Sequence, residues 1–311
     1  MVLENIYIVR HAFRMNFSID HRTGAYSTTS PLPTGIPSDP VLTAHGLAQA
    51  DQLGAHLAAI QPPIDAIYCS PYYRCIQTLL PTLRRLPLHV TTHSPLASPP
   101  SPATLPLPDR LRVRIEPGLG DFHGRAPFAH PKPATTAELE NEHFPGLLDM
   151  QYKAVLEPDV YGDTLEGLHE RVAYVLGKIV EECDRTGVKT VLICSHAACI
   201  IVAGRVLTGV MPEDFAEDDF QCYTAGLSVY RRKGVATRFE EVGEKTMEGV
   251  PKVKWKGTGV GGGWDCIKNS DCSFLSGGEE RGWKFYGDES FMMDPNGVND
   301  AVLESKDSSK L

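Results

Sequence analysis

The chain lacks a long hydrophobic run and an excess of positive charge. No uncharged stretch approaches the ~18 residues that a membrane span needs, and the start, Met1 to Asn5, has no basic region followed by an apolar one. The 30 Lys and Arg against 39 Asp and Glu give a net charge of −9. General nucleic-acid binding relies on net basic patches, so this balance argues against it. We expect a cytoplasmic or nuclear protein with no membrane contact and no direct nucleic-acid partner.

Cysteine is also scarce: the 8 cysteines of the 311 residues are too few for a disulfide scaffold. Cys266 and Cys272 are too far apart for the two-residue spacing that lets both sulfurs of such a pair bind one zinc ion. Five others lie in apolar or strand-like stretches and are predicted to be reduced, buried thiols: Cys69, Cys183, Cys194, Cys199 and Cys222.

Apolar residues make up 42% of the chain, enough for the core of one large or two modest domains. Three short apolar runs each end in polar residues: 5–9 before Arg10-His11, 64–69 before Ser70-Pro71, and 190–194 before Ser195-His196. The carboxyl ends of parallel strands meet at one edge of a sheet. The sequence therefore predicts an α/β fold with a mainly parallel sheet and a site at that edge.

Helical periodicity fills the gaps between these strands. A helix is predicted to follow a Thr43 cap, and Asp163-Thr164-Leu165-Glu166 resembles a capping box before an apolar stripe that ends at Gly187. Ala197–Leu207 reads as a buried helix closed by Gly209.

The chemistry-bearing residues at the strand ends favour an anion site. His11 and His196 have no carboxylate at metal-ligand spacing, whereas two imidazoles beside several guanidiniums suit a dianion. Arg74 falls in the first turns of a helix, where free backbone amides also attract phosphate. The sequence predicts a phosphate site with no metal and no organic cofactor.

Six motifs occur in an order that resembles the histidine phosphatase superfamily, in its phosphoglycerate-mutase-like branch. They span roughly residues 1–240 and are Ile8-Val9-Arg10-His11-Ala12, Leu42-Thr43-x-x-Gly46-x-x-Gln49-Ala50, Ser70-Pro71-x-x-Arg74-x-x-Gln77-Thr78, Glu116-x-x-Leu119-Gly120-Asp121-Phe122-x-Gly124, Gly162-Asp163-Thr164-Leu165-Glu166 and Val191-Leu192-Ile193-Cys194-Ser195-His196-Ala197. The resemblance implies a three-layer α/β/α fold and a metal-independent phosphatase that forms a covalent phosphohistidine.

The same resemblance implies roles for single residues. His11 would be the nucleophile, Glu116 the general acid and base, and His196 would both bind phosphate and assist catalysis. The implied phosphoryl ligands are Arg10, Arg14, Arg74 and His196, where Arg14 is similar to an extra arginine of the T-cell ubiquitin ligand phosphatases.

Two departures keep a second hypothesis open. Ala12 and Ala197 replace glycines that are usual in the family, and they favour a catalytically weak or inactive phosphatase-like scaffold, for example in a TFIIIC-like transcription complex. The complete set of implied catalytic residues favours the enzyme, whose phosphorylated substrate the sequence does not name.

The composition divides the chain into three parts. We expect a histidine phosphatase domain over 1–243, a small Trp- and Gly-rich β appendage over 244–294 that could bind a protein partner, and a disordered tail over 295–311. Residues 20–41 and the proline-rich tract 94–102 are predicted to be surface loops. Four further histidines are expected to be ordinary: His45, His123, His130 and His143.

Overall fold

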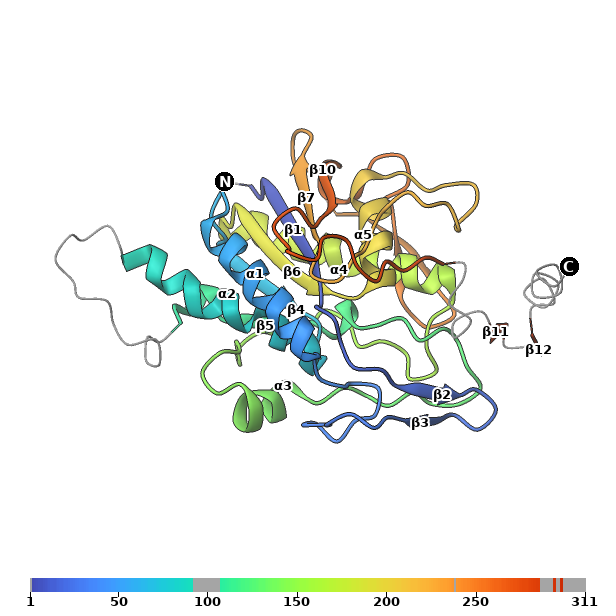
Figure 1. Cartoon of the computed structure of the whole chain (residues 1–311). Helices are drawn as coiled ribbons and strands as arrows, with labels where there is room; N and C mark the ends of the chain where they lie inside the picture. Colours follow the sequence, from blue (N-terminus) through green and yellow to red (C-terminus); the bar gives the residue numbers. More distant parts are fainter. Residues whose placement is uncertain (1, 92–106, 238, 286–292, 295–296, 299–311) are drawn as a thin grey trace, which may run out of the picture.

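The computed structural model describes residues 2–91, 107–237, 239–285, 293–294 and 297–298, and its centre is a six-stranded sheet (Figure 1). Four strands run parallel in the order β1 (Asn5–Arg10), β6 (Thr190–Ser195), β4 (Ala66–Cys69) and β5 (Val113–Ile115). Beyond β1, β7 (Leu227–Arg232) is antiparallel to β1, and the edge strand β10 (Trp264–Asp271) is antiparallel to β7. The predicted mainly parallel sheet is confirmed.

Helices cover both faces of this sheet (Figure 1). α1 (Ala44–Ala59) and α2 (Tyr73–Thr91) pack together on one face, and α4 (Leu165–Thr186) and α5 (Ala197–Thr208) pack on the other. Because side chains alternate along a strand, Ile6 and Ile8 of β1 join the α4/α5 core, while Tyr7 and Val9 join the α1/α2 core. The three-layer α/β/α prediction is therefore confirmed.

The helix ends follow the sequence signals closely. The Thr43 hydroxyl accepts from the Gly46 amide at 3.0 Å and starts α1. α4 is capped by Thr164, which accepts from the Gly167 amide at 2.9 Å. Gly187 and Gly209 end α4 and α5 in the left-handed region, at φ of 75° and 79°.

The connections contain short elements that periodicity does not reveal. Residues 20–41 were expected to be a loop, but the start of this segment belongs to a hairpin in which β2 (Ser18–Asp20) pairs with β3 (Ala25–Ser27). The remaining short elements are η1 (Asp109–Leu111), η2 (Pro117–Leu119), α3 (Thr136–Glu138), η3 (Leu139–His143) and η4 (Val260–Gly262). The predicted loop 94–102 lies outside the described residues.

The segment after residue 243 contributes to the main body of the molecule. It completes a hairpin of β8 (Glu241–Lys245) with β9 (Pro251–Val253), supplies β10, and ends in the small pair β11 (Met293–Asp294) and β12 (Gly297–Val298). Trp255 and Trp264 are buried in the α4/α5 core. The boundary at 243/244 remains a prediction, and most of the tail 295–311 lies outside the described residues. No helix in the described part of the chain is long and apolar enough to cross a membrane.

Candidate active site

The carboxyl ends of β1 and β6 bring the two central histidines together. Arg10 is the last residue of β1 and pairs in register with Ser195, so His11 and His196 follow neighbouring strands at the same level. The His11 amide donates to the Ser195 carbonyl at 3.0 Å, and the two imidazole rings meet edge to face with centroids 5.2 Å apart. The convergence expected from the sequence is present.

His11 is held in one tautomer by its own backbone. Its Nδ1 lies 2.9 Å from the Ala12 carbonyl oxygen, which can only accept, so Nδ1 carries the proton and Nε2 keeps its lone pair. The side chain is buried, and burial together with the charge of Arg74 and the neighbouring His196 lowers the pKa of His11 well below its usual value. The imidazole is therefore neutral at pH 7.

His196 is also buried and fixed at both ring nitrogens. Nδ1 lies 3.2 Å from an Nη2 of Arg74, which can only donate, so Nε2 is the protonated nitrogen and donates to the Ser70 hydroxyl at 2.7 Å. Burial is the main cause that lowers the pKa of His196. This ring is thus a neutral, immobile part of the site.

Arg74, in the first turn of α2, is completely buried between two carboxylates. It donates from Nη1 to Asp39 at 3.1 Å and to the Ser38 carbonyl at 2.9 Å, and from Nη2 to Asp121 at 2.7 Å. Among the described residues, its buried Nε has no hydrogen-bond partner. Asp39 comes from the 20–41 segment and was not singled out by any motif in the sequence.

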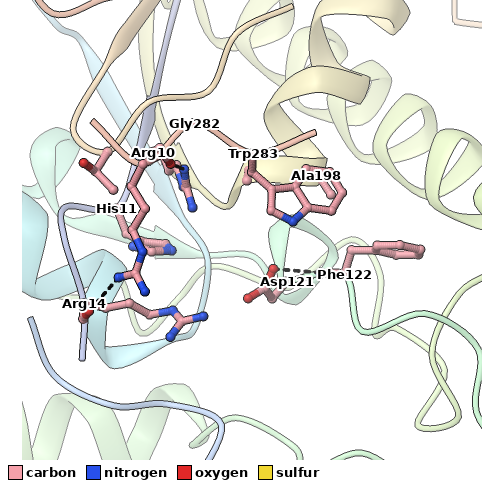
Figure 2. A pocket seen from close by; sticks show the side chains of 11 residues that line it. Arg10, His11, Arg14, Asp121, Phe122, Ala198, Gly282 and Trp283 are labelled. Carbon is pink, nitrogen blue, oxygen red and sulfur yellow. Dashed lines mark hydrogen bonds between the residues drawn. The ribbon is translucent and has the colours of Figure 1, made fainter. Parts of the chain in front are cut away.

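A pocket of about 130 Å³ opens beside these residues (Figure 2). Figure 2 shows Arg10, His11 and Arg14 on one side and Phe122, Ala198 and Trp283 on the other. The lining residues are Arg10, His11, Arg14, Asp121, Phe122, Ala197, Ala198, Thr224, Arg281, Gly282 and Trp283. Arg74 and His196 lie next to this lining and contact Asp121. The structure thus groups His11, His196 and all three arginines predicted to bind phosphate.

The cationic side of the pocket has unused capacity for an anion. Arg10 donates from Nη1 to the carbonyls of Cys222 and Arg281, at 2.7 and 2.5 Å, while its buried Nε has no hydrogen-bond partner in the described part of the chain. Burial lowers the pKa of Arg14 to about 9, and repulsion by Arg74 adds to this effect. A bound dianion would relieve that repulsion and supply the missing acceptors.

The structure does not bring Glu116 into the pocket. This carboxylate is fully buried and accepts hydrogen bonds from one hydroxyl and three amides. The donors are Tyr152 Oη at 2.8 Å, Val155 N at 2.7 Å, Gly118 N at 2.9 Å and Leu156 N at 3.2 Å. Glu116 therefore anchors residues 152–156 to the sheet edge.

Asp121 is the carboxylate that lines the pocket, and the sequence reading missed it. It stands in the same motif as Glu116, so a second acidic residue in that motif was the available signal. The η2 turn lies between the two residues and separates their surroundings. Burial alone would raise the pKa of Asp121, but His196 and Arg74 together lower it, so the carboxylate is ionised.

Three further observations concern the two alanines, the cysteines and metal-binding groups. Among the described residues other than glycine, positive φ occurs at Ala225, Ser270 and Arg281, so Ala12 and Ala197 bring no backbone strain. All eight cysteines are free, and the five predicted to be buried thiols are buried. Across residues 2–91, 107–237 and 239–285, no group of three or more His, Cys, Asp or Glu side chains could hold a metal ion.

Comparison with known proteins agrees with this arrangement. The model of the histidine phosphatase superfamily (branch 1) matches residues 6–97. The transcription factor tau 55 kDa subunit of Saccharomyces cerevisiae is 28% identical over 92% of this chain, and the ecdysteroid-phosphate phosphatase of Drosophila melanogaster is 28% identical over 68%. The chain spans 59% and 28% of the lengths of these two relatives.

Among solved structures, the ecdysone phosphate phosphatase of Bombix mori, in complex with tungstate, is similar in fold. The TM-score is 0.54 at 20% identity, covering 74% of this chain and 90% of the other. By its ordered motifs and by the match over residues 6–97, the chain is similar to the histidine phosphatase superfamily, branch 1.

Proposed function

We propose that the chain hydrolyses phosphomonoesters through a covalent phosphohistidine on His11. The observation that supports this most directly is a neutral His11, with Nδ1 protonated and Nε2 unprotonated, beside a pocket with several guanidiniums. The Nε2 lone pair attacks phosphorus while the ester P–O bond breaks, and its electrons go to the leaving oxygen. Arg10 and Arg14 offset the negative charge of the phosphoryl group in the transition state.

The second half of the reaction removes the phosphoryl group. Water attacks phosphorus, the P–N bond breaks and returns its electrons to Nε2 of His11, and inorganic phosphate leaves. The water must lose a proton when it attacks the phosphohistidine. In the first step, the leaving oxygen must gain one.

We assign both proton transfers to Asp121, not to Glu116. Asp121 lines the pocket, whereas the oxygens of Glu116 are taken by four donors outside it. A phosphoryl dianion beside Asp121 raises the pKa of its carboxyl, because two like charges in one site disfavour ionisation. Asp121 then takes up a proton on substrate binding, donates it to the leaving oxygen and later accepts one from water.

The pocket also favours one class of leaving group. The wall opposite the arginines consists of Trp283, Phe122 and Ala198 (Figure 2), which suits an apolar alcohol better than a sugar. The names of the insect relatives, phosphatases of ecdysteroid and ecdysone phosphates, agree with that class.

The test is hydrolysis of para-nitrophenyl phosphate between pH 5 and 8 in the presence of EDTA, by wild type and by His11→Ala. We expect wild-type activity to survive EDTA and the variant to retain below about 1% of it, because the nucleophile is gone. Circular dichroism checks that the variant is folded. Residual activity above a few per cent would remove His11 from the role of nucleophile.

A second candidate function is a non-catalytic scaffold in a TFIIIC-like transcription complex. It is favoured by the similarity to the tau 55 kDa subunit, which extends over 92% of this chain and therefore past residue 243. In this role the protein would be nuclear and residues 244–294 would contact a protein partner, whereas the enzyme could also be cytoplasmic. A folded wild-type protein with no hydrolytic activity in the assay above would favour the scaffold.

A further inference from the structure

The C-terminal part of the described chain closes one side of the pocket. We call residues 276–285 the closing segment, and contacts hold it along its length. At its start the Ser276 hydroxyl accepts from the side-chain amide of Gln52 in α1, and at its end Phe285 is buried. Between them Glu280 contacts His45 at 2.6 Å, and its carbonyl accepts from the Thr224 amide at 3.1 Å. Residues 281–283 line the pocket, as Figure 2 shows for Gly282 and Trp283.

The backbone of Arg281 faces a predicted phosphoryl ligand. Its carbonyl oxygen accepts from Nη1 of Arg10 at 2.5 Å. Arg281 has a φ of 51°, a conformation that is unusual for a residue other than glycine and is kept only where the surroundings enforce it. The surrounding contacts thus hold a strained residue at the point where its carbonyl orients Arg10.

The side chain of Arg281 holds the loop that follows the nucleophile. Nη1 donates to the Arg14 carbonyl at 3.0 Å, and Nη2 donates to the Asn16 side-chain oxygen. The guanidinium carbon lies 4.5 Å from the centre of the Phe13 ring, within the range of a cation–π contact. These three contacts fix residues 13–16, which carry the second pocket arginine, Arg14.

We propose that Arg281 is a positioning residue for phosphoryl binding, which holds Arg10 through its carbonyl and Arg14 through its guanidinium. This inference rests on the proposed function, because it takes the arginine pocket as the phosphoryl site. It goes further by making the closing segment, which follows the motifs of the family, a required wall of that site. Without the clamp, the loop 13–16 would have to be ordered when the anion binds, and affinity would fall.

The test compares Arg281→Ala and Arg281→Lys with wild type. Calorimetric titration with tungstate reads anion affinity without turnover, and para-nitrophenyl phosphate hydrolysis gives kcat and KM. We expect Arg281→Ala to weaken tungstate binding about tenfold and to raise KM by a similar factor, with a smaller change in kcat, because His11 and Asp121 are untouched. Lysine keeps the charge but not the two-point geometry, so it should restore part of the loss.

The matched control is Lys284→Ala, in the same segment. Lys284 is exposed, pairs with Asp218 and does not line the pocket, so its removal should leave tungstate affinity unchanged. If Arg281→Ala does not fold, Asn16→Ala removes one partner of the same guanidinium at an exposed position and should weaken tungstate binding to a smaller degree.

Four results would overturn the proposal. The first is wild-type tungstate affinity in a folded Arg281→Ala variant, and the second is wild-type affinity in Asn16→Ala if Arg281→Ala does not fold. The third is a loss of tungstate affinity in Lys284→Ala that equals the loss in Arg281→Ala. The fourth is no tungstate binding by the wild type. Failure of the proposed function has a different signature, the absence of His11-dependent hydrolysis. Tungstate affinity remains measurable in that case, so the two failures are distinguishable.

Discussion

Two carboxylates in one motif have opposite surroundings, and these decide what each can do. Glu116 accepts from four hydrogen-bond donors and does not line the pocket, while Asp121 contacts the Arg74 guanidinium and His196 at the pocket wall. Burial raises the pKa of Glu116 despite these hydrogen bonds, whereas the neighbours of Asp121 lower its pKa. A raised pKa alone is therefore a poor guide to a general acid, because the group must also reach the substrate.

The two side chains can be separated by matched amide variants. Asp121→Asn should keep the fold and lower kcat by about 100-fold or more, because the proton transfers are lost. Glu116→Gln should instead lower the free energy of unfolding by about 2–3 kcal/mol, since hydrogen bonds to a charged acceptor become neutral ones. Steady-state kinetics and urea denaturation of both variants check this. Loss of turnover in a stable Glu116→Gln protein, with an active Asp121→Asn, would return the role to Glu116.

The sequence predicted those site residues that come directly after strands or open a helix. His11 and His196 have that place, and Arg74 lies one residue inside α2, so topology alone brings them to one edge. Asp39 and Asp121 were not predicted, because their roles depend on how an irregular loop and a 3₁₀ turn direct them. Local direction of this kind leaves no periodic signal in a sequence.

At the scale of elements, the glycine-rich stretch after residue 256 looks in sequence like the start of a separate unit, but it brings the chain back to the sheet. Gly259 has a φ of 73°, and a Cβ there would lie 2.2 Å from the Leu207 carbonyl oxygen at the end of α5. This close approach requires glycine, and it lets Trp264 start β10 with its indole buried and donating to the Val260 carbonyl at 2.9 Å. The composition change at residue 244 therefore marks a change of local structure inside a shared core.

Trp264 and Ile267 of β10 provide a matched pair for testing this shared core. Trp264 is fully buried and packs under Arg232, whereas Ile267 is 49% exposed. Trp264→Ala should lower the free energy of unfolding of the whole protein by about 3–5 kcal/mol in a single transition. Ile267→Ala should change it by about 0.5 kcal/mol or less. A biphasic urea curve in Trp264→Ala, with the transition of the preceding residues unaffected, would show instead that the segment after residue 243 unfolds on its own.

At the scale of the whole molecule, the pocket has the opposite sign of charge to the chain as a whole. The chain carries a net charge of −9, yet its pocket is lined by Arg10, Arg14 and Arg281 together with the neutral His11, whose ring lies against that of His196. In water, counterions screen the acidic residues on the surface, but they screen buried guanidiniums far less. The overall charge therefore argues against non-specific polyanion binding without weakening the proposed dianion site.

Burial of neutral histidines also makes the stability of the molecule depend on pH. His169 of α4 is buried, stacks on Trp255 and donates from Nδ1 to the Leu165 carbonyl at 2.7 Å. Burial lowers its pKa from the usual 6.5 to about 4. Below pH 6.5 the unfolded chain binds a proton that the folded protein does not, so this contribution to stability is complete above that pH and decreases as the pH falls towards 4.

At pH 5 the loss from His169 amounts to about 2 kcal/mol relative to pH 7.5. His169→Gln keeps a polar side chain at the Leu165 carbonyl but removes the titration. Urea denaturation at pH 7.5 and pH 5 should therefore show a stability decrease that is smaller in the variant by about that amount. His11 and His196 act in the same direction in both proteins and cancel in the comparison. Equal pH dependence in wild type and variant would mean that His169 is already protonated, or freely titrates, in the folded state.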